Sequence, residues 1–390
     1  MTIQEMFERE PIYSIIEKTL HEYYREVYKR DIDVKIQRKK FLQKFLIYPR
    51  LGVIVPVFPS KKVRREVYAW FDVQNNIARK IIAKTYIFLC FITFGLLSDA
   101  SMILSDDSIF TNNMLIIPSN RKIRIYDFQT GIIDSVIKDG FNDFYFNNEI
   151  YVREEYDYPF ILKIMKKGNR WYRERLLCGK GLVRIHPVEY NNFLDQVLND
   201  LSMLYKNTRK DIKINEYCIK LGNKLKKSLE EVIYRKKIKC GERLSSLIDI
   251  CLEIVAGMHE TFPVVLAHGD LQNGNIHIDE DMHKAYIIDW ETAEEKSIWY
   301  DSETLLCYTR RKGRFAQMIN ERSYPETKEK ILFFDENKNR NMDAVAAVLL
   351  LEELKFYLDE MIDLPGEIGF EVIDRFIYEL DCVNWSSLRA

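Results

Sequence analysis

The sequence predicts an α+β protein in which a small, mostly antiparallel β-sheet precedes a larger helical region. Apolar runs separated by turn signals over residues 114–177 predict short strands. Apolar residues at spacings of three and four after Gly179 predict long helices. The 390 residues, 47% of them apolar, are enough for two or three domains, and this composition excludes disordered and low-complexity proteins.

Residues 1–108 are expected to form a mostly helical N-terminal extension, whose role the sequence does not indicate. Helical spacing of apolar residues runs through residues 1–48 and returns over residues 63–97. Between them, residues 51–57 read LGVIVPV and predict a short strand. Polar residues over 105–113 mark the end of the extension.

The extension is basic, whereas the rest of the chain is acidic. Residues 1–100 hold 18 Lys and Arg against 11 Asp and Glu, and the remaining 290 hold 40 against 48. Residues 85–98 are fourteen uncharged residues, fewer than the roughly 20 that a spanning helix needs. We favour a buried helix with solvated basic faces. The alternative is a peripheral contact of residues 60–98 with a membrane or another anionic surface.

The cysteines and the first residues favour a cytoplasmic protein. The seven cysteines are widely spaced and form no C-x-x-C pair, so a disulfide framework or a zinc ribbon is not expected. The first residues, MTIQEMFEREP, are polar and acidic and do not resemble a signal peptide. If residues 60–98 contact a membrane, its inner face is the expected place.

Residues 109–178 are expected to form a β-rich lobe. One helix is predicted at residues 144–154. Strands are predicted at residues 114–117, 123–126, 132–138, 160–165 and 170–177.

Residues 179–390 are expected to form a helical lobe with one strand-rich island. Helices are predicted at residues 190–205, 216–235, 244–259, 341–361 and 370–380. The island has strands at residues 264–267, 275–278 and 285–289.

The strand-rich island contains the candidate catalytic and metal-binding residues. His268, Gly269 and Asp270 follow its first strand, Asn275 lies five residues after Asp270, and Asp289 ends its last strand. Phosphoryl transfer needs these residue types together, because a carboxylate orients the acceptor hydroxyl and oxygen ligands hold Mg²⁺ at the phosphates. A hydrolase is disfavoured, since no nucleophile lies in a G-x-S-x-G motif.

The pattern H-G-D-x-x-x-x-N followed by I-D-W resembles the catalytic signature of the aminoglycoside phosphotransferase and choline kinase-like family. This family is a branch of the protein-kinase-like fold. The resemblance covers roughly residues 114–380 and is strongest over residues 264–306. It implies a two-lobed protein-kinase-like fold, with a small antiparallel β lobe and a larger helical lobe.

The resemblance also implies roles for the motif residues. Asp270 would be the catalytic aspartate, and His268 would brace its loop rather than react. Asn275 and Asp289 would hold Mg²⁺. Asp301 matches a downstream aspartate that bonds the backbone of the catalytic loop, although the two residues after it differ from the usual Leu-Ala of the family.

A kinase of this type also needs a lysine on its third strand, which holds the α- and β-phosphates, and a helix glutamate that orients it. Lys138 ends the third predicted strand and Glu149 lies on the following helix, so we select this pair. Lys163 and Glu174 have the same separation of eleven residues. Choosing them would leave no segment for the linker that binds adenine.

Residues 174–179 read ERLLCG and resemble the family linker E-x-L-x-G. From this resemblance, Glu174 to Leu176 are expected to offer backbone hydrogen bonds to adenine.

The loop between the first two strands of this lobe, PSNRK at residues 118–122, contains no glycine. Phosphate contact is therefore expected from Ser119, Asn120 or backbone N–H groups. The alternative is an ordinary hairpin turn.

These observations predict an ATP-dependent phosphotransferase that uses Mg²⁺ and phosphorylates a hydroxyl group of a small molecule. An amino sugar, a choline-like alcohol and a glycan precursor remain open as acceptors. A protein acceptor is disfavoured because no A-P-E activation segment is visible. The basic runs at residues 234–239 and 310–314 favour solvated surface over nucleic-acid binding. The alternative function is a non-catalytic, membrane-peripheral kinase-like scaffold that binds nucleotide.

Overall fold

The computed structural model describes residues 6, 10–38, 44–70, 77–109, 111–236, 238–321, 341–363 and 369–385. The chain divides into two compact units. The first unit comprises Met1–Asp157, Ile161–Ile185 and Ile278–His283, and the second comprises Tyr158–Phe160, His186–His277 and Lys284–Ala390.

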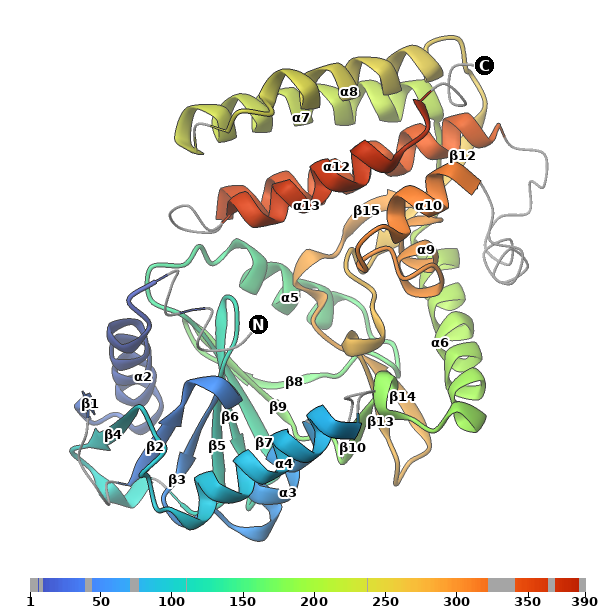
Figure 1. Ribbon diagram of the computed structural model, residues 1–390. Coiled ribbons are helices and arrows are strands. Elements are labelled where there is room, and N and C mark those ends of the chain that lie inside the picture. The colour runs from blue at the N-terminus through green and yellow to red at the C-terminus, as the bar shows by residue number, and fades with distance from the viewer. Residues whose placement is uncertain are drawn as a thin grey trace. The chain divides into compact units, whose positions relative to one another are not determined.

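A nine-stranded antiparallel sheet forms the centre of the first unit (Figure 1). From one edge to the other its strands are β1 (Val34–Arg38), β4 (Ala100–Leu104), β2 (Phe45–Tyr48), β3 (Val53–Pro56), β5 (Met114–Pro118), β6 (Lys122–Asp127), β7 (Ile132–Ile137), β9 (Trp171–Arg175) and β8 (Ile164–Lys167).

The N-terminal extension is continuous with this sheet. Strand β3 pairs with β5 through Ile54 and Ile116, so the four described strands of residues 1–108 and the five of residues 109–178 form one sheet. We predicted two separate domains here, and the structure instead places both segments in one compact unit that extends to Ile185.

Helix α2 (Ile12–Tyr28) is the helix expected near the N-terminus, but it ends earlier than predicted. Lys29 follows it with a left-handed φ of 55°, which stops helical hydrogen bonding. The described residues after it form β1 and β2, and all four residues of β2 are buried. The prediction of a helix through residue 48 was therefore wrong, because a fully buried apolar strand lacks the alternation that would reveal it.

Helices cover both faces of the nine-stranded sheet (Figure 1). Helix α2 packs on one face, and α3 (Lys61–Trp70) and α4 (Ile77–Ile92) pack on the other. The alternation of strand side chains explains this, since Ile54 joins the core under α2 while Val53 and Val55 join the core under α3 and α4. Helix α5 (Phe144–Glu155) connects β7 to β8.

The second unit is mainly helical. Its described helices include α6 (Pro187–Thr208), α7 (Ile214–Lys236), α8 (Gly241–Val255), α9 (Tyr300–Leu306), α10 (Arg314–Glu321), α12 (Met342–Asp363) and α13 (Gly369–Cys382). Helix α12 is buried along most of its length and packs against α7, α8 and α13.

Short strands in this unit position the motif residues. Strands β11 (Lys210–Lys213), β12 (Thr261–Ala267) and β15 (Glu294–Ser297) form an antiparallel sheet. Strand β13 (Ile276–Asp279), whose last two residues belong to the first unit, and strand β14 (Lys284–Ile287) follow the motif loop. The predicted α+β class, with an antiparallel sheet and a larger helical part, is confirmed.

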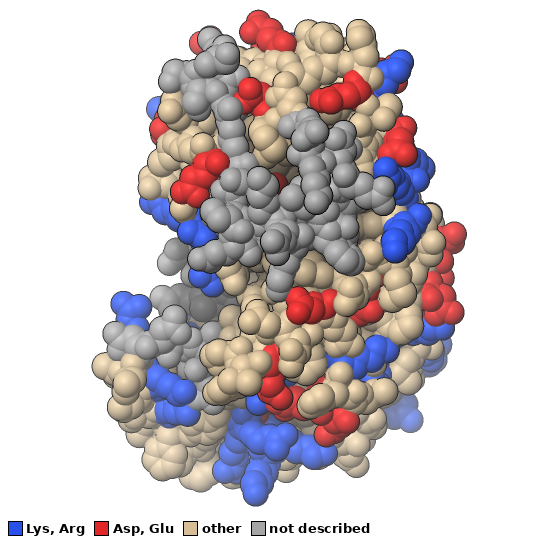
Figure 2. All heavy atoms as spheres, turned by 90° about the vertical axis from the view of Figure 1, so that its right-hand side faces the viewer, with Lys and Arg blue, Asp and Glu red and all other residues tan. Residues whose placement is uncertain are grey.

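Acidic and basic side chains are mixed over the described part of the face in Figure 2, and basic ones gather at its lower end. Among the described residues, no helix has the length and apolar character needed to cross a membrane.

Candidate functional site

The motif loop begins where β12 ends, and Gly269 fixes its shape. Gly269 has a φ of +84°, and a Cβ atom there would lie 2.2 Å from the backbone oxygen of Thr292. Both the left-handed backbone and this close approach require glycine. The turn directs the chain from β12 into Asp270.

Asp301, at the start of α9, holds the backbone of this loop. Its carboxylate accepts hydrogen bonds from His268 N at 2.5 Å, Gly269 N at 3.0 Å and the Tyr205 hydroxyl at 2.9 Å. Asp301 is fully buried, so these bonds compensate for the loss of hydration. The predicted bonding of Asp301 to the loop backbone is confirmed.

His268 is a brace inside the second unit. Its Nδ1 lies 3.3 Å from the Asp270 backbone N–H, and its Nε2 lies 2.9 Å from the Ile288 carbonyl. Accepting the N–H at Nδ1 leaves the proton on Nε2, where it can be donated to Ile288. The ring is buried against Trp290, at 4.8 Å between centroids. Both ring nitrogens are thus used to hold the loop, as expected of a bracing residue.

The Asp270 carboxylate is held by one of its two oxygens. Oδ1 accepts from Gln272 Nε2 at 2.8 Å and from Arg310 Nε at 3.0 Å. Among the described residues, Oδ2 has only a long contact of 3.4 Å with Asn275 Nδ2. The Asp270 side chain remains 25% exposed. The second oxygen is therefore available to a group arriving from solvent.

Arg310 is a site residue that the sequence did not reveal. Its side chain is only 8% exposed, and its guanidinium also bonds Glu353, the Tyr300 hydroxyl and the Gly269 carbonyl. It lies 3.7 Å from the centroid of the Phe356 ring. Burial is the largest single influence and opposes its charge, but Glu353, Tyr300 and Asp270 together outweigh burial and raise the pKa of Arg310 above its usual range.

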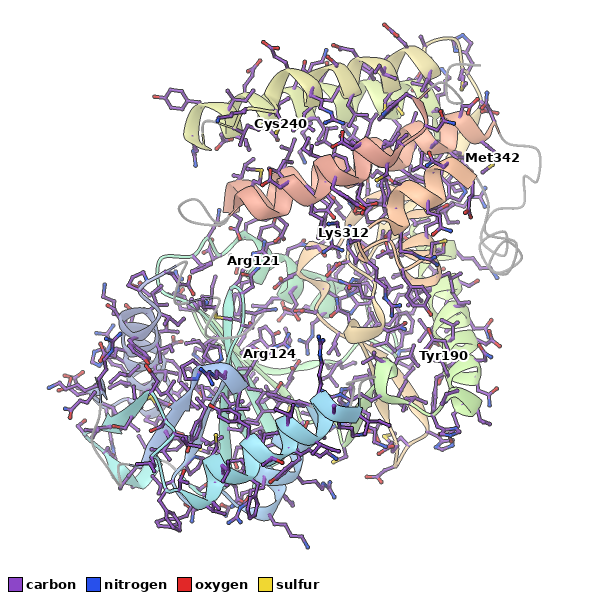
Figure 3. All side chains as sticks on the ribbon, viewed as in Figure 1. Arg121, Arg124, Tyr190, Cys240, Lys312 and Met342 are labelled. Carbon is purple, nitrogen blue, oxygen red and sulfur yellow. The ribbon has the colours of Figure 1, made fainter. Side chains whose placement is uncertain are left out.

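The prediction of solvated surface for residues 310–314 is therefore wrong for Arg310. A run of basic residues does not show that one member turns inward, and nothing else in the sequence marked it. Arg311 and Lys312 are exposed, as expected, and Figure 3 labels Lys312.

Asn275 and Asp289 end up near each other through a backbone contact. Ile288 N donates to the Asn275 carbonyl at 2.9 Å, which joins the two strand ends. Asp289 adopts a left-handed φ of 69°. One carboxylate oxygen of Asp289 lies within 4.8 Å of one of Glu291.

These residues fit a hard divalent cation. Asn275 Nδ2 donates to the Asp270 carbonyl at 2.8 Å, so the amide oxygen is the atom that remains for a metal. This amide oxygen and the carboxylates of Asp289 and Glu291 are all oxygen donors, the type of ligand that Mg²⁺ prefers. Glu291 was not among the predicted metal ligands. Trp290 and Trp299 are buried core residues.

Two tyrosine hydroxyls lie beside the loop. Tyr190 of α6, labelled in Figure 3, is within 3.0 Å of Asn273 Nδ2 and 3.3 Å of the Tyr308 hydroxyl. Burial, followed by the bond to Tyr308, raises the pKa of Tyr190. Tyr190 is therefore a neutral hydrogen-bonding group at physiological pH.

In the first unit, Glu149 is paired with a different lysine from the one predicted. Lys122 Nζ, at the start of β6, lies 2.6 Å from Glu149 Oε2. Arg153, one turn further along α5, lies 3.3 Å from Glu149 Oε1 and 2.6 Å from Glu174 Oε2. The positive charges of Lys122 and Arg153 thus compensate the negative charges of two carboxylates, those of Glu149 and Glu174, and all four side chains are nearly buried.

Lys138 has another role. Its side chain is fully buried, and its ammonium bonds the Glu10 carboxylate and lies 3.6 Å from Met6 Sδ. The predicted pair of Lys138 and Glu149 is corrected accordingly. Lys122 was overlooked because it lies in the turn-rich segment PSNRK, and no local pattern shows which strand faces the helix glutamate.

The predicted adenine linker also needs correction. Glu174 lies in β9, opposite Ile133 of β7, and its side chain bonds Arg153. Leu176 N donates to the Gly131 carbonyl at 2.9 Å. The N–H of Leu176 is therefore used within the first unit and cannot donate to adenine without breaking that bond.

The segment at residues 118–122 is a hairpin turn between β5 and β6. Ser119 N and Oγ both donate to the Lys122 carbonyl, at 2.8 and 2.9 Å. Ser119 is thus committed to the turn, and Asn120 lies within it. Arg121, which Figure 3 labels, is buried against Tyr145 with its guanidinium carbon 4.1 Å from the ring centroid.

Comparison with known proteins supports the resemblance noted in the sequence. The model of the phosphotransferase enzyme family matches residues 195–329, a segment that contains His268, Asp270, Asn275, Asp289 and Arg310. The resemblance to this family is confirmed. No curated protein matches the chain.

Several solved structures are partly similar to this chain. An ethanolamine kinase of Plasmodium vivax has 13% identity and a TM-score of 0.44, over 83% of this chain and 94% of that chain. A choline kinase of Cryptosporidium parvum has 12% identity and a TM-score of 0.45, over 69% and 88%. An aminoglycoside phosphotransferase in a ternary complex with ADP and hygromycin B has 13% identity and a TM-score of 0.44, over 71% and 93%.

Proposed function

We propose that this protein transfers the γ-phosphoryl group of ATP to a hydroxyl group of a small molecule. The proposal rests on how the Asp270 carboxylate is held. Its Oδ1 accepts two hydrogen bonds, whereas its Oδ2 has only a long contact and can accept a bond from a substrate. A carboxylate fixed in this way can orient a hydroxyl donor without itself moving. The match of residues 195–329 to a phosphotransferase family supports the same chemistry.

Asp270 Oδ2 accepts a hydrogen bond from the acceptor hydroxyl and directs its oxygen toward the γ-phosphorus. The new bond joins this oxygen to phosphorus, while the bond from phosphorus to the bridging oxygen of ADP breaks. The hydroxyl proton passes to Asp270 and then to solvent. Arg310 keeps the carboxylate in position during the transfer and is itself neutralised by Glu353.

Asn275 and Asp289, with Glu291 beside them, hold Mg²⁺ in this proposal. When bound, Mg²⁺ neutralises phosphate charge and orients the phosphates for in-line transfer. The backbone bond between Ile288 and Asn275 keeps these ligands in register.

Lys122, rather than Lys138, binds the nucleotide phosphates in this proposal. Glu149 orients Lys122, as the corresponding lysine and glutamate do in kinases. Asn120, in the preceding turn, is retained as a candidate for phosphate contact. Because Leu176 N–H bonds Gly131, we no longer assign it to adenine.

The acceptor is an amino sugar, a choline-like alcohol or a glycan precursor. The hydroxyls of Tyr190 and Tyr308 beside the loop suit a polar, hydroxylated molecule of this kind. A panel of such compounds is screened for acceptor-dependent ADP release from Mg·ATP. One acceptor that stimulates ADP release, with a phosphomonoester as product, supports the proposal. Tight nucleotide binding with no ADP release for any class of acceptor would favour a non-catalytic scaffold.

A further inference from the structure

Helix α4 (Ile77–Ile92) is apolar on two opposite sides. Ile87 and Cys90 are buried in the core against the nine-stranded sheet. At about 100° per residue, the large apolar residues exposed on α4 spread over about 140°, centred opposite to those two. They are Ile77, Ile81, Ile82, Phe88, Leu89 and Ile92, with exposed fractions of 40–76%.

The exposed apolar surface continues past the end of the helix. Phe94, Leu96 and Leu97 are 47%, 62% and 39% exposed. Phe58, which precedes α3, is 56% exposed and its ring lies 5.6 Å from that of Phe94. We call these four residues, together with the six exposed apolar residues of α4, the α4 patch. A contiguous apolar surface of this kind marks an interaction site.

Positive charge flanks the α4 patch. Helix α4 contains no acidic residue, and its basic residues are Arg79, Lys80 and Lys84. On the helical wheel, Lys80 and Lys84 lie along one edge of the exposed apolar arc and Arg79 lies along the other. The neighbouring helix α3 adds four basic residues against one acidic residue.

We propose that the α4 patch docks on an anionic lipid bilayer. Apolar side chains enter the boundary between headgroups and acyl chains, while flanking Lys and Arg side chains reach the lipid phosphates. Helix α4 has 16 residues and lies in the plane of the surface rather than across it. A second copy of the chain is disfavoured as the occupant, because it would present the same positive border. The proposal is independent of the phosphotransferase activity.

Co-sedimentation of the full chain with vesicles tests this proposal. Vesicles of phosphatidylcholine alone are compared with vesicles that also contain phosphatidylserine. We expect binding to the anionic vesicles, with a partition coefficient that falls as salt is added. In the variant I81Q/I82Q/F88Q we expect binding to fall by about tenfold or more. In the variant R79Q/K80Q/K84Q we expect loss of the preference for phosphatidylserine.

Met165 provides a matched control, because it is 63% exposed in the same unit but lies outside the patch. The variant M165Q is expected to bind vesicles as the wild type does. Three outcomes would overturn the proposal. They are a wild type that stays in solution with both kinds of vesicle, a patch variant that binds as well as the wild type, and self-association through the patch without vesicle binding.

Discussion

Lys122 Nζ and Glu149 Oε2 lie 2.6 Å apart, and their side chains are only 3% and 2% exposed. A nearly buried lysine that is paired with a helix glutamate is the arrangement by which kinases orient a cation toward nucleotide phosphates. Here the lysine comes from the first residue of β6, whereas the lysine at the end of β7 is bound to Glu10. The two lysines can therefore be separated by experiment.

Replacing Lys122 by Met is expected to lower kcat/KM for ATP by about 100-fold, because it removes a cation from the nucleotide phosphates. Steady-state ADP release at varied ATP concentration measures this change. Circular dichroism checks that the variant remains folded.

Lys138→Met is the matched control. It leaves the nearly buried Glu10 carboxylate without its ammonium partner and is expected to lower the free energy of unfolding by about 3–5 kcal/mol. Folded Lys138→Met protein should retain kcat/KM within about threefold of wild type, since its partner is the structural Glu10. The reverse ranking of the two variants in kcat/KM would contradict the assignment of Lys122.

Arg310→Lys is expected to lower kcat by about 10- to 100-fold with little change in KM for ATP, because a single ammonium cannot bridge Asp270, Gly269 and Glu353. Glu353→Gln disturbs the far end of the same bridge without touching Asp270. Glu353→Gln should destabilise the fold, but its kcat should remain higher than that of Arg310→Lys. Equal loss of kcat in the two variants would mean that Arg310 acts only through stability.

Asp301→Asn replaces an acceptor of backbone N–H bonds with an amide that can accept through only one oxygen. We expect turnover to fall by about 100-fold or more, because the loop that carries Asp270 loses its anchor. Tyr205→Phe removes the third bond to Asp301 and leaves both backbone bonds in place. It should cost less than about tenfold in turnover. A larger loss in Tyr205→Phe than in Asp301→Asn would contradict the anchoring role.

Glu303 predicts a pH dependence of stability. Burial and the nearby Glu352 carboxylate raise the pKa of Glu303 from 4.5 to about 8. The folded protein thus retains a proton that the unfolded chain releases near pH 4.5. The contribution of this retained proton to the free energy of unfolding is complete below pH 4.5. It falls by about 1.4 kcal/mol per pH unit as pH rises toward 8.

Thermal unfolding of Glu303→Gln tests this dependence. The variant should gain stability relative to wild type as pH rises from 5 to 8. Glu230→Gln makes the same chemical change at an exposed position of α7 and serves as the control. Parallel pH profiles for wild type and Glu303→Gln would show that Glu303 does not titrate in this range.

The motif loop could be predicted because its chemistry is local in sequence. Gly269 is required by the turn, and Asp270 and Asn275 are five residues apart on one loop. Arg310 and Lys122 could not be predicted in the same way. Arg310 reaches Asp270 across 40 residues, and Lys122 reaches Glu149 across 27. Such contacts depend on how elements pack, which spacing alone does not encode.

The extension shows a similar limit. Its helices follow from periodicity, since each has a buried and an exposed side. Its strands β2 and β3 are buried throughout, so their patterns do not alternate and their pairing with β4 and β5 could not be inferred. The apolar run over residues 85–98 was expected to be buried, but the structure buries only one side of α4.

The most direct test of the central claim compares nucleotide binding with turnover in Asp270→Asn. Calorimetric titration with Mg·ATP should give a dissociation constant within about threefold of wild type, while ADP release with the best acceptor should fall by about 10²- to 10⁴-fold. Such a split is expected if Asp270 orients the acceptor hydroxyl and does not hold the nucleotide. Wild-type turnover in Asp270→Asn would contradict the account.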